Sequence, residues 1–390
     1  MNIPFSKVNC CGRERELVSE VLESGWLTTA AKTQQFEKEF GNAVGATYAC
    51  AVNSCTAALH LALEALGIGK QDKVLVPSMT FTSSAEVIRY LGADPIFLDV
   101  DYNTRLVTPE IVEDALVLNP NTKAIVIVHF GGQAAAMPDV DGKEGIISIC
   151  KRYNVRIIED AAHAFPSRIG SQYVGSFGDV TCFSFYANKT ITTGEGGMLV
   201  TEDEEIFNRV KTMRLHGINR DIWNRFTDNK SPWEYDVIAP GYKYNMPDIN
   251  AAIGLAQLER ANEFRDGRQR CADFYDKALK MINCLDLPVC LGEREAHSWH
   301  LYPVVINEKS SVTRNDLIEK LGKLGVGTSV HYKPLHRMTY YRDLYHLEPK
   351  DFPNSERIWR GTVSLPIYFG INELELEYVS ECLEKLLGCE

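Results

Sequence analysis

The amino-acid sequence predicts an α/β protein whose mostly parallel, mixed sheet is covered by helices on both faces. Across about the first 260 residues, short apolar segments typical of strands alternate with segments of helical periodicity. The strand-like segments are apolar along their whole length, as in AIVIVHF at 124–130, which is typical of strands buried on both faces. A chain of 390 residues with 45% hydrophobic residues is also long enough to bury a large core.

The expected elements follow in order, and two helices have clear end signals. The first spans 54–66, with Ser54 as its N-cap and Gly67 as its end. Another spans 108–116, with Thr108 as its cap and Pro109 in its first turn. The remaining expected helices are 83–92 and 145–154, and the expected strands are 74–77, 94–101, 124–130, 155–160, 179–186 and 196–201.

A second, smaller unit is expected in the C-terminal part of the chain. A long helical stretch begins near Pro247 and Asp248 and continues to about residue 280, where it bridges to this unit. Beyond it the buried-strand segments become fewer, with a strand at 301–306 and a helix within 312–325. We therefore predict a large domain over 1–262, including the N-terminal segment, and a smaller α+β domain over 263–390.

Charge and composition exclude several function classes. The formal net charge of −11 argues against an extended nucleic-acid surface, although backbone amides and a few basic residues can still hold small anions. No apolar stretch is long enough to span a membrane, and the N-terminus does not resemble a signal peptide. The eleven cysteines are odd in number and include no C-x-x-C pair, so we expect no metal site and a reducing cytoplasm. No G-x-G-x-x-G follows a strand, which argues against a nicotinamide enzyme.

Two reactive side chains stand at the ends of predicted strands. VRIIED ends at Asp160, and Lys189 closes CFSFYANK, just before the glycine turn of TITTGEGG. Ligands of α/β sheets bind beyond the carboxyl ends of the strands, so Asp160 and Lys189 are expected to meet in one crevice. Taken without its surroundings, an Asp and a Lys in a sequence are more often a simple ion pair or two unrelated surface residues.

Five longer motifs carry a family resemblance. SFYANKTITTGEGGMLVT, EDAAHA, NSCTAALHLAL, VPSMTFTSSAEV and GYKYNMPDINAAIGLAQLE resemble the DegT/DnrJ/EryC1/StrS family, in the order in which that family has them. The resemblance extends from the N-terminal segment to VSLPIY near the C-terminus. It implies the fold type I of pyridoxal-phosphate-dependent transferases and the activity of a nucleotide-sugar aminotransferase.

The resemblance implies a role for each matching residue. Lys189 resembles the lysine that binds pyridoxal 5'-phosphate as a Schiff base and later moves a proton, for which a primary amine is needed. Asp160 resembles the carboxylate that faces the pyridine nitrogen and keeps it protonated. Phe81 matches the aromatic ring stacked on the cofactor, although by itself it would be interpreted as a core residue. His163 matches a position near the ring hydroxyl, where a loop histidine is the alternative.

The phosphate of the cofactor is expected at the start of the first helix. Ser54, Cys55 and Thr56 offer backbone amides and a hydroxyl there, and Cys55 stands where the family often has glycine. Ser184 matches a serine whose hydroxyl contacts the same phosphate. Asn245 matches an asparagine that reaches the cofactor phosphate of the neighbouring subunit, which implies a homodimer with shared active sites. Taken alone, Asn245 is a cap or turn residue.

Substrate contacts are less well defined by the sequence. His331, in SVHYKPLH, matches a loop that lies over the sugar nucleotide in related enzymes, and a hydrophilic surface loop is the alternative. Arg220 and Arg225, in INRDIWNRF, could hold a diphosphate bidentately, and a solvated loop is the alternative.

The resemblance implies transfer of an amino group, by family habit from L-glutamate, to a nucleotide-linked keto sugar. GYKYNMPDINAAIGLAQLE and HGINRDIW are similar to the branch that makes UDP-4-amino sugars, so a UDP-4-keto sugar is expected; dTDP- or GDP-linked sugars and amination at C3 remain open. The related dehydratases have histidine in place of Lys189 and are disfavoured. A regulatory protein that binds the cofactor without turnover is a further alternative.

Overall fold

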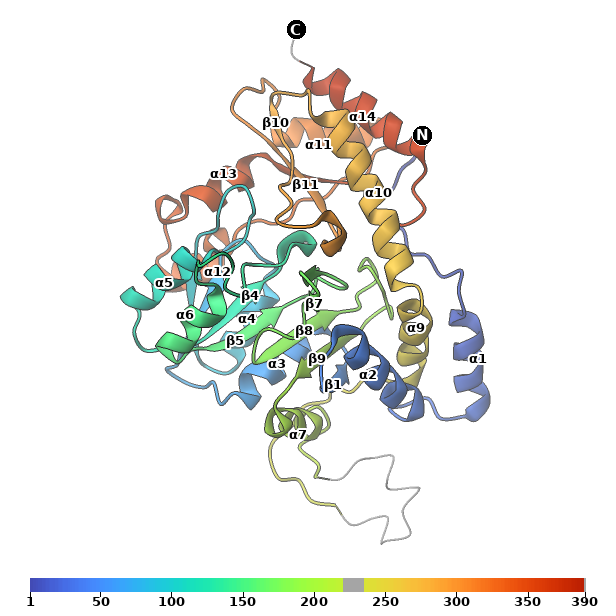
Figure 1. Cartoon of the computed structure of the whole chain (residues 1–390), viewed down its shortest axis with the longest axis vertical. Helices are drawn as coiled ribbons and strands as arrows, with labels where there is room; N and C mark the ends of the chain where they lie inside the picture. Colours follow the sequence, from blue (N-terminus) through green and yellow to red (C-terminus); the bar gives the residue numbers. More distant parts are fainter. Residues whose placement is uncertain (220–234, 389–390) are drawn as a thin grey trace.

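A computed structural model describes residues 1–219 and 235–388 of the chain. Its large unit is built on a seven-stranded sheet, and a smaller unit lies above this sheet in the view of Figure 1. Arg220 and Arg225 lie outside the described residues. In the described part of the chain, no helix has the length and apolar character needed to cross a membrane.

The large sheet is mostly parallel, as predicted. Its strand order is β1-β9-β8-β5-β4-β2-β3, and β9 runs antiparallel to both of its neighbours, which makes the sheet mixed. The remaining neighbouring strands pair in parallel. The strands are β1 Tyr48–Val52, β2 Lys73–Pro77, β3 Asp94–Leu98, β4 Thr122–Val128, β5 Arg156–Asp160, β8 Val180–Ser184 and β9 Gly197–Thr201.

Helices cover both faces of this sheet, which explains why its strands are apolar throughout. On one face, α3, α4 and α7 pack on residues such as Val74 and Val76; on the other, α2, α5, α6 and α9 pack on alternate residues such as Leu75. The helices of this unit are α1 Glu14–Ser24, α2 Ala31–Val44, α3 Cys55–Ala65, α4 Ser83–Tyr90, α5 Pro109–Leu118, α6 Ile146–Tyr153, α7 Glu204–Met213 and α9 Asp248–Leu258. A short hairpin joins β6 Arg168–Ile169 to β7 Gln172–Tyr173.

Both predicted helix caps are confirmed, but the long helix is not continuous. Ser54 Oγ accepts a hydrogen bond from the Ala57 amide, and Thr108 Oγ1 accepts one from the Ile111 amide. The predicted helix from 248 to about 280 is broken at Arg260 into α9 and α10 Ala261–Leu279. No glycine or proline marks the break. It lies where the N-terminal segment crosses, since Arg260 Nη1 donates to Asn9 Oδ1 (2.9 Å), a contact that the local sequence does not reveal.

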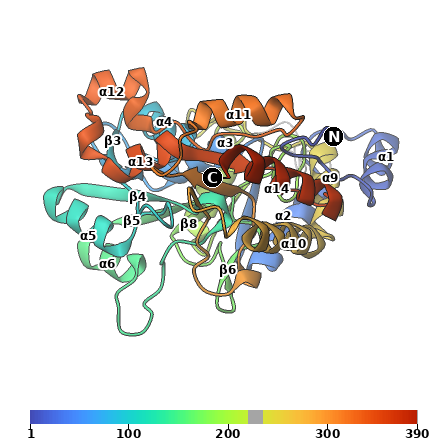
Figure 2. The ribbon, with the colours of Figure 1, turned by 90° about the horizontal axis from the view of Figure 1, so that it is seen from above.

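The C-terminal unit is an α+β structure with its own core. Its antiparallel sheet has the order β10-β11-β12 and packs with α10, α11 and α14; α10 and α14 lie side by side in both views (Figures 1 and 2). Ile3 belongs to this core through a bridge to Val326, although the N-terminal segment was predicted to belong to the large domain. The division of the chain at 262 and 263 stays a prediction. The elements of this unit are β10 Leu285–Asp286, β11 Tyr302–Ile306, β12 Thr362–Leu365, α11 Arg314–Lys323 and α14 Glu373–Leu387. Two helices of the same stretch, α12 Thr339–Tyr345 and α13 Pro353–Gly361, pack instead on the large unit through Tyr341 and Ile358.

Candidate active site

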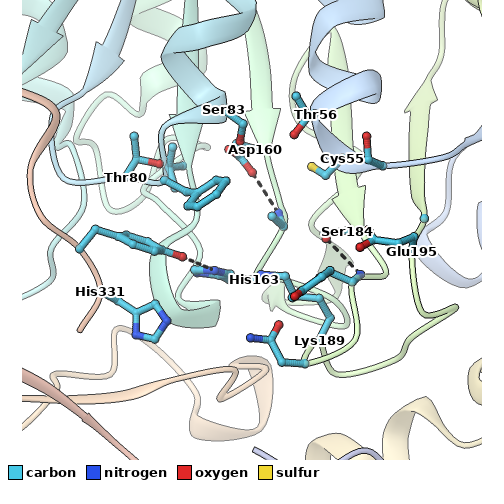
Figure 3. A pocket seen from close by; sticks show the side chains of 18 residues that line it. Cys55, Thr56, Thr80, Ser83, Asp160, His163, Ser184, Lys189, Glu195 and His331 are labelled. Carbon is cyan, nitrogen blue, oxygen red and sulfur yellow. Dashed lines mark hydrogen bonds between the residues drawn. The ribbon is translucent and has the colours of Figure 1, made fainter. Parts of the chain in front are cut away.

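The ends of β5 and β8 and the start of β9 surround one cavity of about 370 Å³. β5 ends at Asp160, and β8 ends at Ser184, five residues before Lys189, so the parallel strands bring both to the same edge of the sheet, as the sequence predicted. Figure 3 shows Cys55 and Thr56 on one side of the cavity and His331 on the other, with Asp160, His163 and Lys189 between them. The lining residues are Ser54, Cys55, Thr56, Thr80, Phe81, Ser83, Val128, Asp160, Ala162, His163, Ser184, Tyr186, Asn188, Lys189, Glu195, Gly196, His331 and Tyr332.

The N-terminus of α3 forms one wall of the cavity. Ser54 is the N-cap, and Cys55 and Thr56 form the first turn, so their backbone amides lack partners within the helix and carry the positive end of its dipole. Gly197, the first residue of β9, allows this close approach. A Cβ added there would lie 2.5 Å from the carbonyl carbon of Ser54 and 2.6 Å from the Cys55 nitrogen.

Asp160 is a buried carboxylate with two neutral donors. Its Oδ2 accepts a hydrogen bond from the Ser84 hydroxyl (2.7 Å), and its Oδ1 accepts one from the Ala162 amide (3.2 Å). Burial raises the pKa of Asp160, and the two hydrogen bonds and the charge of Lys189 oppose this effect only in part. A cationic group bound next to Asp160 would therefore offset the cost of burying its negative charge.

Lys189 is an amine with a reduced affinity for its proton. Burial lowers its pKa to about 8, and the positive charge of Arg268 acts in the same direction, whereas Cys55 and Asp160 oppose the shift. An amine with this pKa is partly unprotonated near neutral pH, which makes it a nucleophile and a base.

His163 has a defined tautomer in this cavity. The Gly131 amide donates to its Nδ1 (3.2 Å), so in the neutral ring the proton is on Nε2, which then donates to the Tyr332 hydroxyl oxygen (3.1 Å). Burial and the charge of Lys189 lower the pKa of His163 well below its usual value, which favours this neutral form. The Tyr332 hydroxyl is left with its own proton to donate.

The side chains at the mouth of the cavity differ in their exposure. Phe81 is 56% exposed, which excludes the interpretation of this residue as part of the core. Its ring centroid lies 5.9 Å from that of Tyr332. His331 is buried rather than part of a solvated loop, and its Nδ1 lies 2.8 Å from the Ser364 hydroxyl. Ser184 Oγ accepts a hydrogen bond from the Tyr186 amide (3.3 Å).

Asn245 does not line the cavity of its own chain. Its Nδ2 donates to Thr29 Oγ1 (2.7 Å), and its Oδ1 accepts a hydrogen bond from Lys243 Nζ (2.5 Å). Its expected contact with the active site of a neighbouring subunit stays a prediction.

Sequence reasoning missed several lining residues. Tyr332 directly follows His331, and Glu195 lies within the TTGEGG turn, so adjacency to predicted residues could have identified both. Thr80 and Ser83 flank Phe81 in the same way. Among the residues that the structure describes, no group of histidine, cysteine, aspartate or glutamate side chains could hold a metal ion.

Several known proteins are similar to this chain over nearly its whole length. The model of the DegT/DnrJ/EryC1/StrS aminotransferase family matches residues 10–384. The spore coat polysaccharide biosynthesis protein SpsC of Bacillus subtilis is 42% identical over 99% of this chain and 97% of its own. Spr1654 of Streptococcus pneumoniae, assigned as a sugar aminotransferase and solved in its PLP form, is 30% identical, with a TM-score of 0.88 over 100% of this chain and 99% of its own.

A further solved structure extends the comparison. PseC of Helicobacter pylori, an aminotransferase involved in the biosynthesis of pseudoaminic acid, is 26% identical, with a TM-score of 0.88 over the full length of both chains.

Proposed function

Since the chain belongs to the DegT/DnrJ/EryC1/StrS aminotransferase family, we propose that it transfers the amino group of L-glutamate to a nucleotide-linked keto sugar. It is a pyridoxal-phosphate-dependent aminotransferase. The observation that carries the proposal is the presence of Lys189 and Asp160 in one cavity, beside the N-terminus of α3. The polysaccharide pathway named for SpsC supports a sugar as the acceptor.

The lining of the cavity fits the cofactor. When bound, pyridoxal 5'-phosphate supplies a carbonyl group that takes up the amine and a ring that accepts electrons. The amides of Cys55 and Thr56 and the hydroxyl of Ser184 suit its phosphate, and the exposed ring of Phe81 suits its ring face. Asp160 is a buried carboxylate without a cationic hydrogen-bond partner among the described residues, so the protonated ring nitrogen would supply the positive charge that it lacks.

Lys189 and His163 have complementary roles in this proposal. The Lys189 Nζ atom takes a proton from the substrate carbon and returns one to the product, because an amine with a pKa of about 8 can do both near neutral pH. His163 stays neutral, and in the family resemblance it would lie near the ring hydroxyl of a bound cofactor. Glutamate leaves as 2-oxoglutarate in the first half of the reaction, and the keto sugar becomes an amino sugar in the second.

The acceptor that we propose is a UDP-4-keto sugar, with His331 in contact with it. His331 and Tyr332 form the wall opposite α3, so a substrate that enters from this side reaches Lys189 without displacing the phosphate group. Arg220 and Arg225 are proposed as contacts of the diphosphate. A dTDP- or GDP-linked sugar and a 3-keto sugar are the alternatives.

We also propose a cytoplasmic homodimer in which Asn245 completes the site of the partner subunit. The ten cysteines among the described residues are free, in keeping with a reducing compartment. A mixture of Lys189→Ala and Asn245→Ala proteins tests the shared site. Hybrid dimers contain one intact site, so mixing should restore roughly a quarter of the wild-type activity. Activity that stays at the level of the two separate variants would contradict shared sites.

The function is tested with a panel of UDP-, dTDP- and GDP-linked 4-keto and 3-keto sugars, each offered with glutamate while 2-oxoglutarate release is measured. We expect release with a UDP-4-keto sugar and none without an acceptor beyond one equivalent per site. The Lys189→Ala protein is the control and should release none. Absence of release beyond one equivalent per site with every sugar would contradict the proposed function.

A further inference from the structure

Arg268 is a buried cation on α10 that the proposed reaction does not yet use. Arg268 is only 5% exposed, and its Nη1 donates to the carbonyl oxygens of Ile367 (2.9 Å) and His300 (3.2 Å). Its Nη2 donates to the carbonyl oxygen of Asn188 (3.5 Å). The guanidinium therefore holds three separate segments, one of which directly precedes Lys189.

The positive charge of Arg268 has no carboxylate partner among the described residues. It makes no ion pair there, and its buried Nε has no hydrogen-bond partner. Gln257, which lines the same small cavity as Arg268, donates from Nε2 to the buried carboxylate of Glu14 (2.6 Å). A buried cation that is satisfied only by carbonyl groups costs folding free energy, so its presence requires another explanation.

Arg268 and Lys189 share a small cavity of about 20 Å³, which is separate from the large cavity that Lys189 also lines. Arg268, Asn188 and Lys189 all line it, and none of the described residues around it is an aspartate or a glutamate. Asn188 and Lys189 also line the large cavity, so this short segment is a shared wall. The charge of Arg268 therefore acts on Lys189 from the side opposite the substrate, with no intervening acid to neutralise it.

We propose that Arg268 is a positioning residue for the amino transfer: it fixes the backbone beside Lys189 through the Asn188 carbonyl and places an unpaired positive charge behind the lysine. The inference rests on the proposed function, in which Lys189 exchanges protons with the substrate. The direction of the pKa of Lys189, which Arg268 helps to lower, agrees with this role.

Two substitutions separate the charge of Arg268 from its geometry. Arg268→Gln keeps a side-chain donor but removes the charge, and Arg268→Lys keeps the charge but loses the planar fork that binds several carbonyls at once. Arg265→Gln is the matched control. Arg265 lies one turn away on α10 and also donates to a carbonyl oxygen, that of Glu295 (2.5 Å), but it is paired with Asp266 (2.6 Å) and does not line the small cavity.

The readout is the proton affinity of the lysine rather than activity. In the holoenzyme, a pH titration of the visible absorbance reports the protonation of the Lys189 nitrogen in its Schiff base with the cofactor. In protein freed of the cofactor, the rate of uptake of pyridoxal phosphate is measured against pH, because only the unprotonated amine reacts. We expect Arg268→Gln to raise both midpoints by on the order of one pH unit, as expected for the loss of one nearby charge. Arg268→Lys keeps the charge, so both of its midpoints should stay close to the wild-type values. Arg265→Gln should leave both midpoints unchanged.

The outcomes distinguish this inference from the proposed function. If the wild-type protein does not bind pyridoxal phosphate, the proposed function fails. If it binds the cofactor and Arg268→Gln has the wild-type midpoints, the role of Arg268 is refuted. Should Arg268→Gln not fold, Arg268→Lys decides, because it keeps the charge but loses the planar fork that holds the Asn188 carbonyl. Slower uptake of pyridoxal phosphate by this variant would support the positioning role, and uptake at the wild-type rate would overturn it.

Discussion

A methyl group at Gly197 should damage the phosphate-binding wall without touching any reactive residue. In Gly197→Ala, the new Cβ would lie 2.5 Å from the Ser54 carbonyl group, whereas ordinary contacts begin at 3.4 Å. Backbone atoms cannot rotate away, so α3 and β9 must separate by about 0.9 Å, the difference between these two distances. Overpacking of this kind costs about 1–3 kcal/mol of the free energy of unfolding.

The same displacement should weaken cofactor binding. A hydrogen bond of about 2.9 Å from an α3 amide to the phosphate would lengthen beyond the range of effective hydrogen bonds. Loss of one charge-assisted hydrogen bond costs about 1.5–3 kcal/mol, which corresponds to roughly 10–100-fold weaker binding. The assay is an absorbance titration of cofactor-free protein with pyridoxal phosphate, together with thermal unfolding. Gly69→Ala is the control, because nothing lies within 4 Å of its added Cβ. Unchanged affinity in folded Gly197→Ala protein would refute the proposed phosphate site.

Three further predictions follow from the buried polar groups. Asp160→Asn keeps the oxygen that accepts from Ser84 but removes the charge, so kcat should fall by about 10²–10³-fold while the protein stays folded by circular dichroism. Burial lowers the pKa of His297 to about 3, so as the pH falls the unfolded chain binds a proton before the folded protein does. The contribution of His297 to the free energy of unfolding should therefore be complete above about pH 6.5 and decrease as the pH falls from there towards 3. In urea unfolding of His297→Gln over this pH range, the free energy of unfolding should fall less steeply than in the wild type, by about 1.4 kcal/mol per pH unit. His336 joins the Ser78 hydroxyl (2.7 Å) to Glu356 (2.8 Å), so His336→Ala should lower the free energy of unfolding by about 3 kcal/mol, measured in urea; an unchanged midpoint would contradict this.

The elements that the sequence predicted well are those with local causes. The strands of the large sheet and the helices between them could be predicted, because apolar segments and cap residues mark them within a few positions. Ser54, for example, acts as an N-cap because its hydroxyl reaches an amide three residues away. The convergence of Asp160 and Lys189 also follows from a general property, since parallel strands end at the same edge. The family resemblance then supplied the roles of these residues, which periodicity and spacing alone left open.

The features that the sequence did not reveal depend on contacts between distant segments. The break between α9 and α10 lies within good helix-forming residues and coincides with the contact of Arg260 with Asn9. Ile3 joins the C-terminal core through Val326, more than 300 positions along the chain. In the sequence, Arg268 is one of several charged residues on an amphipathic helix. Only the fold brings its guanidinium to the small cavity that Lys189 also lines. These contacts join residues that are far apart in the sequence, so no local sequence pattern predicts them.

The most direct test of the account measures the two halves of the reaction separately on the loaded protein. Glutamate alone should abolish the visible absorbance of the bound cofactor and release one 2-oxoglutarate per site. After the donor is removed, a UDP-4-keto sugar should restore the absorbance and yield one amino sugar per site. Protein that is bleached by glutamate but is not restored by any nucleotide-linked keto sugar would contradict the proposed acceptor, and protein that glutamate does not bleach would contradict the proposed donor.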